Sequence, residues 1–449
     1  MKRTSAVAAA ALALVAGGAF AGSQVVSVAC DRTNCVYAVG EQVTFEVSVR
    51  DAAGALVPTG SVTAVMDNFG PTVFASNRID LAAGNPFTLR GRMSEPGFLR
   101  LSLLSPEIDN PTPYNPGVFI YSAVFSPECI AQRHPCPPDF DAFWADARAK
   151  LAREVPLDPQ ITPDPAHADD AEFAWYHVSF ATFGRRVYGH MTVPRNAPPG
   201  TKFPARVQVP GAGFGAWANH ASTCRGWITL FMSVFPWQLE TDSEPNRPKY
   251  DAMNRDFFAR GLAVGTEKDT TSYHVAGIAK SREDYFYYPV ILGIDRAVDW
   301  LWNRDDVDRR FFTYDGTSQG GAFGLILMGL NRHFTRGVAY VPAMAGHFLH
   351  EQGFRDGWPR YAKAGLKNAE YFDGVFFAAR ITCPVRFSAG YSDTVCPPYG
   401  VHAAYNACKS SDKGIVDGLG MSHSVYGWIY QKLGAWEGEG WIEPKRAGD

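Results

Sequence analysis

The chain has 449 residues and a net charge of -3 at pH 7, with 46% hydrophobic and 19% charged residues. This length is too great for one ordinary hydrophobic core, so we expect two domains. The composition is typical of a globular protein and excludes a disordered chain. No basic stripe stands out, which argues against a nucleic-acid partner.

The first 21 residues have the pattern of a signal peptide. Lys2 and Arg3 precede a short apolar run at residues 6–16, and the alanines of residues 19–21 fit an A-x-A cleavage site. The alternative is a buried N-terminal helix. The run is too short for a membrane span, and no other run is long enough. The pattern therefore predicts a protein that is secreted or periplasmic.

Export changes how the eight cysteines are interpreted. Cys30 and Cys35 lie close together, as do Cys129 and Cys136, and in an oxidising compartment each pair can close a small loop as a disulfide. Zinc binding is the rival interpretation, but no CxxC or HxxxH partner accompanies them, so we expect no metal site. The other four have no obvious partner: Cys224, Cys383, Cys396 and Cys408.

Residues 24–126 predict an antiparallel, Ig-like β-sandwich. The segment EQVTFEVSVRD alternates apolar and polar residues, and PTGSVTAVMDN and GFLRLSLLS repeat this alternation between turn residues. No group of catalytic side chains is present there. Either this domain binds carbohydrate or docks a partner, or it is a structural domain packed against an enzyme, which we favour.

A boundary follows at Pro137 and Pro138, where the amphipathic helix DFDAFWADARAKLAR begins. From about residue 170 strands and helices alternate, which indicates a mainly parallel sheet with helices on both faces. We therefore expect residues 137–445 to form an α/β catalytic domain. In such sheets the reactive groups gather at the carboxyl ends of the strands.

One serine stands at such a strand end, in the segment GTSQG at residues 316–320. It matches G-x-S-x-G, the nucleophile elbow that presents a serine hydroxyl in a strained strand-to-helix turn. The motif is short, and an ordinary glycine-rich turn is the alternative. Ser318 is the candidate nucleophile.

A serine hydroxyl needs a base and an orienting carboxylate, and in α/β-hydrolases the chain order is serine, acid, histidine. His423 lies in a glycine-rich loop and is favoured as base over His402, which lies in a predicted helix. Asp393 directly follows a predicted strand and is favoured as the acid. Its rivals are Asp373, Asp412 and, most seriously, Asp417.

The developing oxyanion needs two hydrogen-bond donors. The backbone N–H of Gln319 is one candidate, and that of Ala212 in the glycine-rich loop VPGAGFG is the other. Trp217 is the aromatic residue nearest this loop and is the candidate substrate contact. A later group of aromatics is more typical of a lid core: Phe348, Phe354, Trp358 and Tyr361.

With these residues in place, the chain resembles the acetyl xylan esterase and cephalosporin C deacetylase family, carbohydrate esterase family seven, over about residues 137–440. The resemblance rests on the helix from PPDFDAFW, the segment DRRFFTYDGTSQGG and the segment EYFDGVFFAAR…SDTVCPP. It implies an α/β-hydrolase fold with Ser318, Asp393 and His423 as the catalytic residues. It also implies Ala212 and Gln319 as oxyanion donors, and O-acetyl esters of xylan-type carbohydrates as substrates, without a cofactor.

Two departures from the family pattern are visible. The R-G-Q motif expected near VGTEKDTTSY is absent, which leaves open whether the chain forms a homo-oligomer, and Ser424 replaces the glutamate that follows the family's histidine. Two rival functions also stay open. One is another serine hydrolase, either a peptidase related to prolyl oligopeptidases or a lactone hydrolase; the other is a non-catalytic glycan-binding surface protein.

Overall fold

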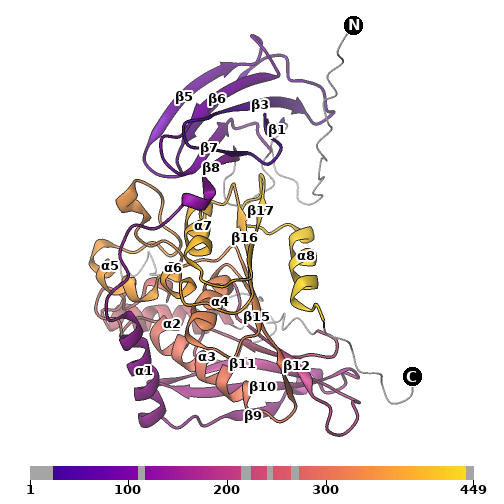
Figure 1. Cartoon of the computed structure of the whole chain (residues 1–449), viewed down its shortest axis with the longest axis vertical. Helices are drawn as coiled ribbons and strands as arrows, with labels where there is room; N and C mark the ends of the chain where they lie inside the picture. The colour runs from indigo at the N-terminus through magenta and orange to yellow at the C-terminus, as the bar shows by residue number, and fades with distance from the viewer. Residues whose placement is uncertain (1–23, 110–116, 214–223, 240–245, 264–272, 441–449) are drawn as a thin grey trace.

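The structure is a computed structural model that describes residues 24–109, 117–213, 224–239, 246–263 and 273–440. Figure 1 shows an antiparallel β domain at one end and a larger α/β domain below it. The expected fold class, a mainly parallel α/β sheet preceded by an antiparallel β domain, is confirmed. Within these ranges no helix is long and apolar enough to cross a membrane.

The elements follow one another along the chain in two groups. The β domain contains β1 Gln24–Cys30, β2 Val36–Tyr37, β3 Gln42–Asp51, β4 Ser61–Asp67, β5 Val73–Asp80, β6 Phe87–Arg92, β7 Gly97–Leu104 and β8 Val118–Phe125. The strands of the α/β domain are β9 Gln160–Pro163, β10 Phe173–Thr182, β11 Arg185–Pro194, β12 Phe203–Gln208, β13 Ile228–Met232, β14 Val307–Thr317, β15 Arg336–Tyr340, β16 Val385–Gly390 and β17 Lys413–Gly418. Its helices are α1 Phe140–Glu154, α2 Arg247–Ala259, α3 Tyr287–Trp302, α4 Gln319–Leu330, α5 Lys363–Ala369, α6 Gly374–Ala378, α7 Pro398–Ala407 and α8 Gly427–Glu437.

Two sheets make up the β domain, with strand orders β1-β3-β6 and β2-β8-β7-β4-β5. All neighbours are antiparallel except β2 and β8. In β3 every second side chain from Val43 to Val49 is fully buried, while the residues between them are exposed or half-buried. The alternation in the sequence thus places one face of each strand in the core between the sheets.

The α/β domain is built on nine strands in the order β17-β16-β15-β14-β12-β13-β11-β10-β9. The pairs from β17 to β13 are parallel, and those from β13 to β9 are antiparallel. Helix α4 packs on β14 and β15 and has only one exposed or half-buried residue, so it lies in the middle of the core. Strands covered on both faces leave their carboxyl ends as the accessible part of the sheet.

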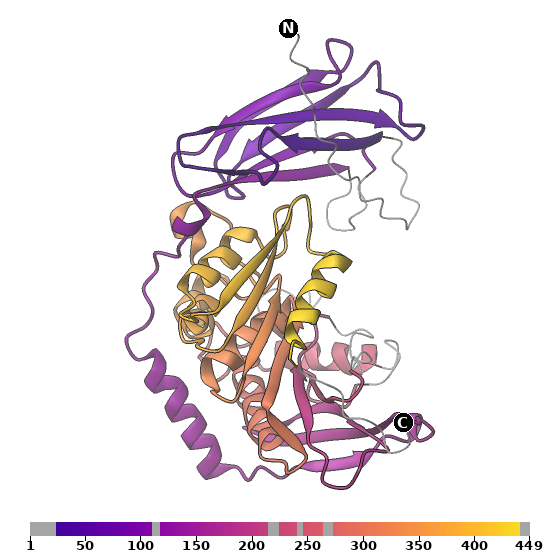
Figure 2. The same ribbon diagram turned by 45° about the vertical axis from the view of Figure 1, so that its right-hand side comes forward.

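The segment after β8 runs down one side of the molecule and leads into helix α1, which lies along the α/β domain (Figure 2). The apolar face of this helix buries Phe140, Trp144, Ala147 and Leu151, and the Trp144 indole Nε1 donates to the Tyr371 carbonyl at 3.0 Å. The apolar spacing in the sequence predicts this face. The helix therefore anchors the segment between the domains to the core of the α/β domain.

The β domain lies beside β16, β17 and α7, as Figures 1 and 2 both show. The ring of Phe98 in β7 packs edge-on against Tyr391 with centroids 5.0 Å apart, and against His402 at 5.2 Å. Ser392 Oγ donates to the Ile120 carbonyl of β8 at 2.7 Å. The two domains thus share a packed contact at the loop that follows β16.

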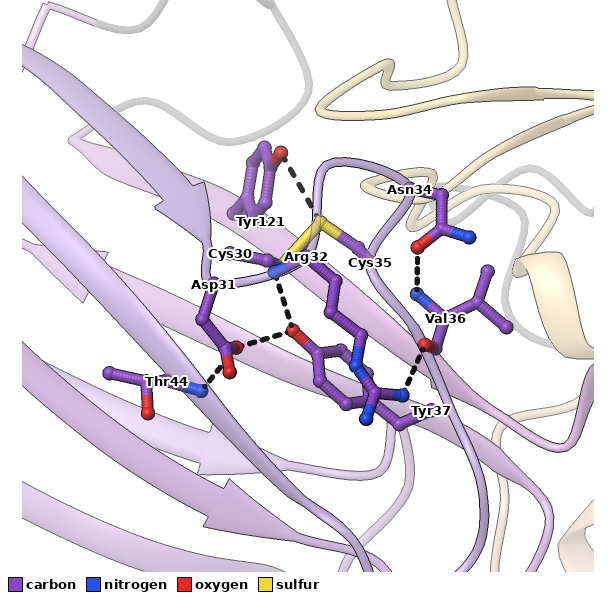
Figure 3. Close-up of a disulfide and its surroundings, with 9 residues drawn as sticks. All are labelled: Cys30, Asp31, Arg32, Asn34, Cys35, Val36, Tyr37, Thr44 and Tyr121. Carbon is purple, nitrogen blue, oxygen red and sulfur yellow. Dashed lines mark hydrogen bonds between the residues drawn. A yellow bond between two sulfur atoms is a disulfide. The ribbon is translucent and has the colours of Figure 1, made fainter. Parts of the chain in front are cut away.

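A disulfide joins Cys30 and Cys35 and closes the short loop between β1 and β2 (Figure 3). Below it the Tyr37 hydroxyl donates to Asp31 Oδ1 at 2.6 Å, and the same oxygen accepts the Thr44 backbone N–H at 2.9 Å. Both ends of the loop are therefore fixed to neighbouring strands.

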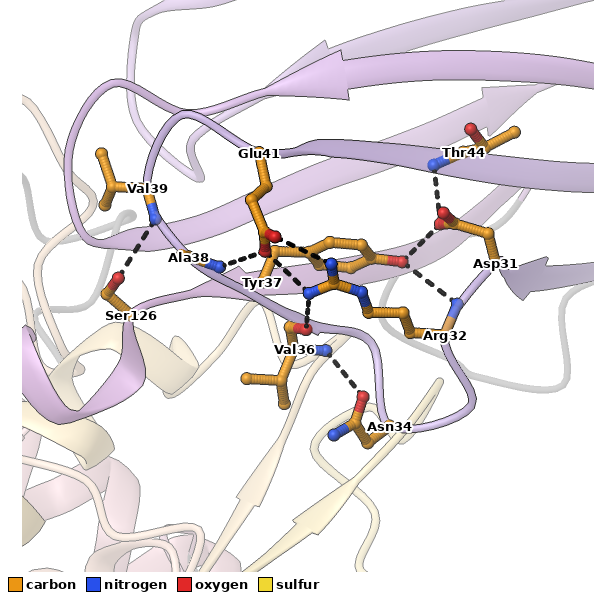
Figure 4. A network of polar contacts seen from close by, with 10 residues as sticks. All are labelled: Asp31, Arg32, Asn34, Val36, Tyr37, Ala38, Val39, Glu41, Thr44 and Ser126. Atoms are coloured by element: carbon orange, nitrogen blue, oxygen red, sulfur yellow. Dashed lines mark hydrogen bonds and ion pairs between the residues drawn. The ribbon is translucent and has the colours of Figure 1, made fainter.

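The outer side of the same loop carries an ion pair (Figure 4). Arg32 Nη1 and Nη2 donate to the two carboxylate oxygens of Glu41 at 2.7 and 2.9 Å. The Val39 backbone N–H donates to Ser126 Oγ at 3.1 Å, and Ser126 follows β8 directly. The turn between β2 and β3 thus connects to the start of the segment that leaves the domain.

The second predicted disulfide is wrong, because Cys129 and Cys136 are free thiols. Cys129 is exposed, whereas Cys136 is half-buried with its Sγ 3.7 Å from Arg380 Nη2. Between them the Arg133 backbone N–H donates to Gln352 Oε1 at 2.8 Å, so the segment is held against another part of the chain. The spacing of two cysteines in the sequence does not show which path the chain takes between them.

Candidate active site

Ser318 occupies the single residue between β14 and α4, in a conformation that few residues adopt. Its φ of 58° and ψ of -116° lie in a region that costs an L-residue about 1–3 kcal/mol. Two backbone hydrogen bonds hold the turn: the Ser318 N–H donates to the Tyr340 carbonyl at 2.9 Å, and the Ala343 N–H donates to the Ser318 carbonyl at 3.0 Å. Strand β15 and the segment after it therefore maintain the strained turn.

The glycines around Ser318 are required by close backbone contacts. A Cβ on Gly316 would lie 2.6 Å from the carbonyl atoms of Gly320, and a Cβ on Gly320 would lie 2.1 Å from the Val209 carbonyl oxygen. Neither gap admits a methyl group, so β12, β14 and α4 meet here only because both residues lack side chains. This turn has the geometry of a nucleophile elbow.

Three of the predicted residues are joined by hydrogen bonds. His423 Nε2 lies 2.9 Å from Ser318 Oγ, and His423 Nδ1 lies 2.8 Å from Asp393 Oδ2. Asp393 is completely buried, and its other oxygen accepts the backbone N–H groups of Val395 and Cys396 at 2.8 and 2.9 Å. The carboxylate is thus oriented by the backbone of its own loop, with Oδ2 directed at the imidazole.

The environment of His423 favours its protonated form. Burial of the imidazole lowers the pKa of His423, but the adjacent Asp393 carboxylate and the Cys396 side chain raise it, and the net pKa lies well above the ordinary value. The Asp393 carboxylate thus stabilises the imidazolium that forms when the neutral imidazole accepts the proton of the neighbouring hydroxyl.

The rival residues occupy other places in the fold. Asp417 Oδ1 lies 3.0 Å from Nε2 of the buried His402, so these two form a separate pair. Asp373 caps α6 by accepting the backbone N–H of the second residue of that helix at 2.9 Å. Asp412 is exposed and pairs with Arg386 at 2.7 Å. Of these four aspartates, only Asp393 is hydrogen-bonded to His423.

Ser318 and His423 open into a cavity of about 670 Å³ at the carboxyl ends of the parallel strands. Ala212 lines the same cavity, and Gln319 begins α4, where backbone N–H groups have no partner within the helix. One of the two residues proposed from the sequence as oxyanion donors thus lines the cavity, and the other directly follows the serine. Other lining residues include Phe231, Trp358, Ser424 and Tyr430.

The Gln319 side chain is also fixed, which sequence reasoning missed. Its Oε1 accepts the Tyr273 hydroxyl at 2.7 Å and also the Tyr287 hydroxyl. Its Nε2 donates to the carbonyls of Pro210 and Gly211 at 3.1 and 3.3 Å. All four hydrogen-bonding positions of the buried amide are therefore filled, and the elbow is tied to the loop that carries Ala212.

Tyr273 extends this connection by one bond. Its hydroxyl accepts the Gly213 backbone N–H at 3.2 Å while donating to Gln319, and the ring is buried. The loop is thus held both before and after Ala212. No local sequence pattern predicts these bonds, because they join residues 32 to 109 positions apart.

Residues 130–426 match the model of the acetyl xylan esterase (AXE1) family. The chain belongs to the acetyl xylan esterase family. It is thus a carboxylic ester hydrolase of the acetyl esterase class, and the resemblance inferred from the sequence is confirmed.

Several acetyl esterases are similar to this chain in sequence or in fold. Acetyl esterase Axe7A of Xylanibacter ruminicola is 28% identical over 401 residues, which cover 85% of this chain and 83% of that protein. The acetyl xylan esterase of Paenibacillus sp. R4 superposes with a TM-score of 0.54 at 21% identity, covering 69% of this chain and 97% of that one. Acetyl xylan esterase 1 of Thermoanaerobacterium sp. gives a TM-score of 0.54 at 19% identity, with coverages of 69% and 96%. The two solved structures support the same fold.

Two sequence features of this family member lie outside the described residues. They are Trp217, the candidate substrate contact, and residues 264–272, where the family's R-G-Q motif is missing. Ser424, which stands where the family has glutamate, lines the cavity beside His423. The substitution therefore falls at the site itself.

Proposed function

We propose that the protein is a serine esterase that removes O-acetyl groups from xylan-type oligosaccharides or related acetylated carbohydrates. The observation that carries this proposal is the chain of hydrogen bonds from Asp393 through His423 to Ser318, which ends in an open cavity. Membership of the acetyl xylan esterase family supports the choice of ester.

In the proposed mechanism Ser318 Oγ attacks the acetyl carbonyl carbon and passes its proton to His423 Nε2. The carbonyl electron pair moves to oxygen, where the N–H groups of Gln319 and Ala212 stabilise the negative charge. Collapse of this intermediate breaks the bond to the sugar oxygen, which takes the proton from His423 and departs as a hydroxyl, leaving acetyl-Ser318. A water molecule repeats the sequence and releases acetate. Asp393 orients the imidazole and stabilises its positive charge throughout.

The aromatic residues that line the cavity support a carbohydrate leaving group. Phe231, Trp358 and Tyr430 bring aromatic surface to its walls, which suits the C–H faces of a sugar ring. The Tyr430 hydroxyl is 3.0 Å from Thr317 Oγ1, so its ring is held beside the elbow. We keep Trp217 as a further proposed contact.

The test is release of acetate from acetylated xylo-oligosaccharides, measured beside peptide and lactone substrates. We expect hydrolysis of the acetylated sugars, and its loss by several orders of magnitude in a folded Ser318→Ala protein. Ser410→Ala is the matched control, because it removes a buried hydroxyl away from the cavity. Preferred cleavage of peptides or lactones, or activity that survives Ser318→Ala, would contradict the proposal. Tight glycan binding without any hydrolysis would favour the non-catalytic alternative.

We also propose that the protein is exported and loses residues 1–21. The basic and apolar pattern of these residues and the Cys30–Cys35 disulfide both support an oxidising destination. N-terminal sequencing of protein from the periplasm or medium should begin at Gly22. Retention in the cytoplasm with Met1 intact would refute the idea.

A further inference from the structure

A second cluster of side chains lies away from the serine, at the antiparallel end of the large sheet. His177 of β10 and His190 of β11 are directly opposite each other in the strand register. Opposed residues of paired strands project from the same face, and here the two imidazoles stack with centroids 5.1 Å apart. Asp164, which follows β9 directly, places its Oδ2 3.4 Å from His177 Nε2. Three strands thus bring two imidazoles and a carboxylate together.

Each of these three side chains offers one donor atom, and the three atoms lie within 4.8 Å of one another. Two imidazole nitrogens and a carboxylate oxygen form a donor set that suits Zn²⁺ and similar divalent transition ions, and three protein ligands leave a fourth position for water. Around tetrahedral zinc the donors would be about 3.3 Å apart, so small side-chain rotations would close the site around an ion.

A neighbouring side chain favours an unprotonated Nε2 on His190, which is the state that a metal ligand needs. The Gln238 amide Nε2 lies 2.6 Å from His190 Nε2 and 3.3 Å from the Gly189 carbonyl. An amide nitrogen only donates, so His190 Nε2 is the unprotonated nitrogen and its lone pair accepts this amide hydrogen. A metal ion would take the place of this amide hydrogen bond.

The carboxylate is held in position by groups outside the donor set. Asp164 is 6% exposed, its Oδ1 accepts the Ala166 backbone N–H at 2.9 Å, and His167 Nδ1 is 2.9 Å from Oδ2. The His167 ring stacks on Trp175 with centroids 4.2 Å apart. Groups of this kind, which orient a ligand without contacting the metal, usually accompany metal sites.

We propose that Asp164, His177 and His190 bind one divalent transition-metal ion of the zinc class, a site that the sequence alone did not predict. The site is structural, because none of the three belongs to the Ser318 constellation. The ion would fasten β9, β10 and β11 to one another at the edge of the sheet. His190 is also directly opposite Phe231 of β13, a residue that lines the active-site cavity, so the metal would stabilise the strand next to that cavity wall.

The test is a calorimetric titration of metal-free, untagged full-length protein with ZnCl₂, together with thermal unfolding with and without zinc. We expect one equivalent to bind and to raise Tm, since an ion that binds only the native state stabilises it. His177→Ala and His190→Ala should each weaken binding at least roughly tenfold and remove the Tm shift, because each removes a ligand. Hydrolysis by both variants in the absence of zinc shows that they are folded.

His350→Ala is the matched control. His350 also pairs with an aspartate, its Nδ1 lying 2.9 Å from Asp356 Oδ2, but within the described residues this pair is not part of a three-ligand cluster. This variant should bind zinc as the wild type does. Absence of saturable binding by the wild type, or equal binding by the wild type and both ligand variants, would overturn the proposal.

Discussion

The β domain and the α/β domain bury their strands in different ways. Along β3 only every second side chain is inside, whereas all five residues of β13 are buried. A strand covered on both faces leaves only its ends for chemistry, and Ser318 stands at such an end. A strand buried on one face keeps its other face for water or for a partner. The comparison explains why the reactive groups are all found in one domain.

The β domain nevertheless contacts the loop that carries the candidate acid. Phe98 and Ile120 of the β domain contact Tyr391 and Ser392, the two residues directly before Asp393. The loop that holds the candidate acid is thus packed by the α/β domain on one side and by the β domain on the other. We expect the two domains to affect turnover to different degrees, and four experiments measure by how much.

The largest effect is expected at the acid itself. Asp393→Asn should lower turnover by about four orders of magnitude, because the imidazole loses its orienting charge. Asp417→Asn is the control and should be mild, since that carboxylate pairs with His402.

The same variant should also move the pH profile. The Asp393 carboxylate raises the pKa of His423, and burial lowers it, so without the carboxylate the pKa falls. The base works when neutral; its activity is lost as pH falls through this pKa. The acidic limb of kcat should therefore shift to lower pH in Asp393→Asn. An unchanged limb would mean that another group sets the profile.

The next effect is expected where the elbow is tied to the oxyanion loop. Gln319→Ala should lower kcat/KM by roughly 10- to 100-fold, because a small displacement of a positioned donor is costly. Gln319→Glu separates shape from hydrogen bonding, since a carboxylate can accept from Tyr273 and Tyr287 but cannot donate to Pro210 and Gly211. Wild-type kinetics in Gln319→Ala would show that the backbone N–H alone suffices.

A smaller effect on turnover should come from the contact between the domains. Phe98→Ala should destabilise the protein by about 3–5 kcal/mol, as truncation of a buried aromatic does, and should lower kcat several-fold through the acid loop. Phe45→Ala is matched in size and burial, but Phe45 is one of the alternating β3 residues that face the core between the two sheets of the β domain. Tm should fall in both variants. When the assay is run well below Tm, kcat should fall only in Phe98→Ala. Equal kcat values would confine the β domain to a structural role.

The smallest effect on turnover is expected at the disulfide. Cys30→Ser with Cys35→Ser opens a very short loop, which costs about 2 kcal/mol of stability in the chain-entropy model. Tm should fall while kcat stays unchanged, since Tyr121, whose hydroxyl is 3.6 Å from Cys35 Sγ, and Ile120 stand between this loop and Ser392. A change in kcat would show that the whole β domain is coupled to the site.

The sequence predicts those features of the molecule that depend on a local pattern of residues. The G-x-S-x-G motif, the chain order and the strand before Asp393 pointed to three residues that the structure places within hydrogen-bonding distance. Alternation predicted the buried face of β3. Each of these signals comes from neighbouring positions along the chain.

The features that were missed depend on which distant segments meet. The Ser392–Ile120 bond spans 272 positions, and the Gln319–Pro210 bond spans 109. The Cys129–Cys136 disulfide was predicted wrongly for the same reason, because a distant glutamine holds the segment between them. Packing decides these contacts, and a single sequence does not carry that information locally.

The contact between the domains also has a consequence for the order of events during synthesis. Ile120 is made 272 residues before the serine that binds its carbonyl. At roughly 5–20 residues per second, the ribosome needs about 15–55 seconds to bridge that interval. During this time Tyr391, against which Phe98 packs, has not yet been synthesised. The β domain must therefore hold together on its own core while one apolar surface awaits the last third of the chain, and a chaperone has that interval in which to bind it.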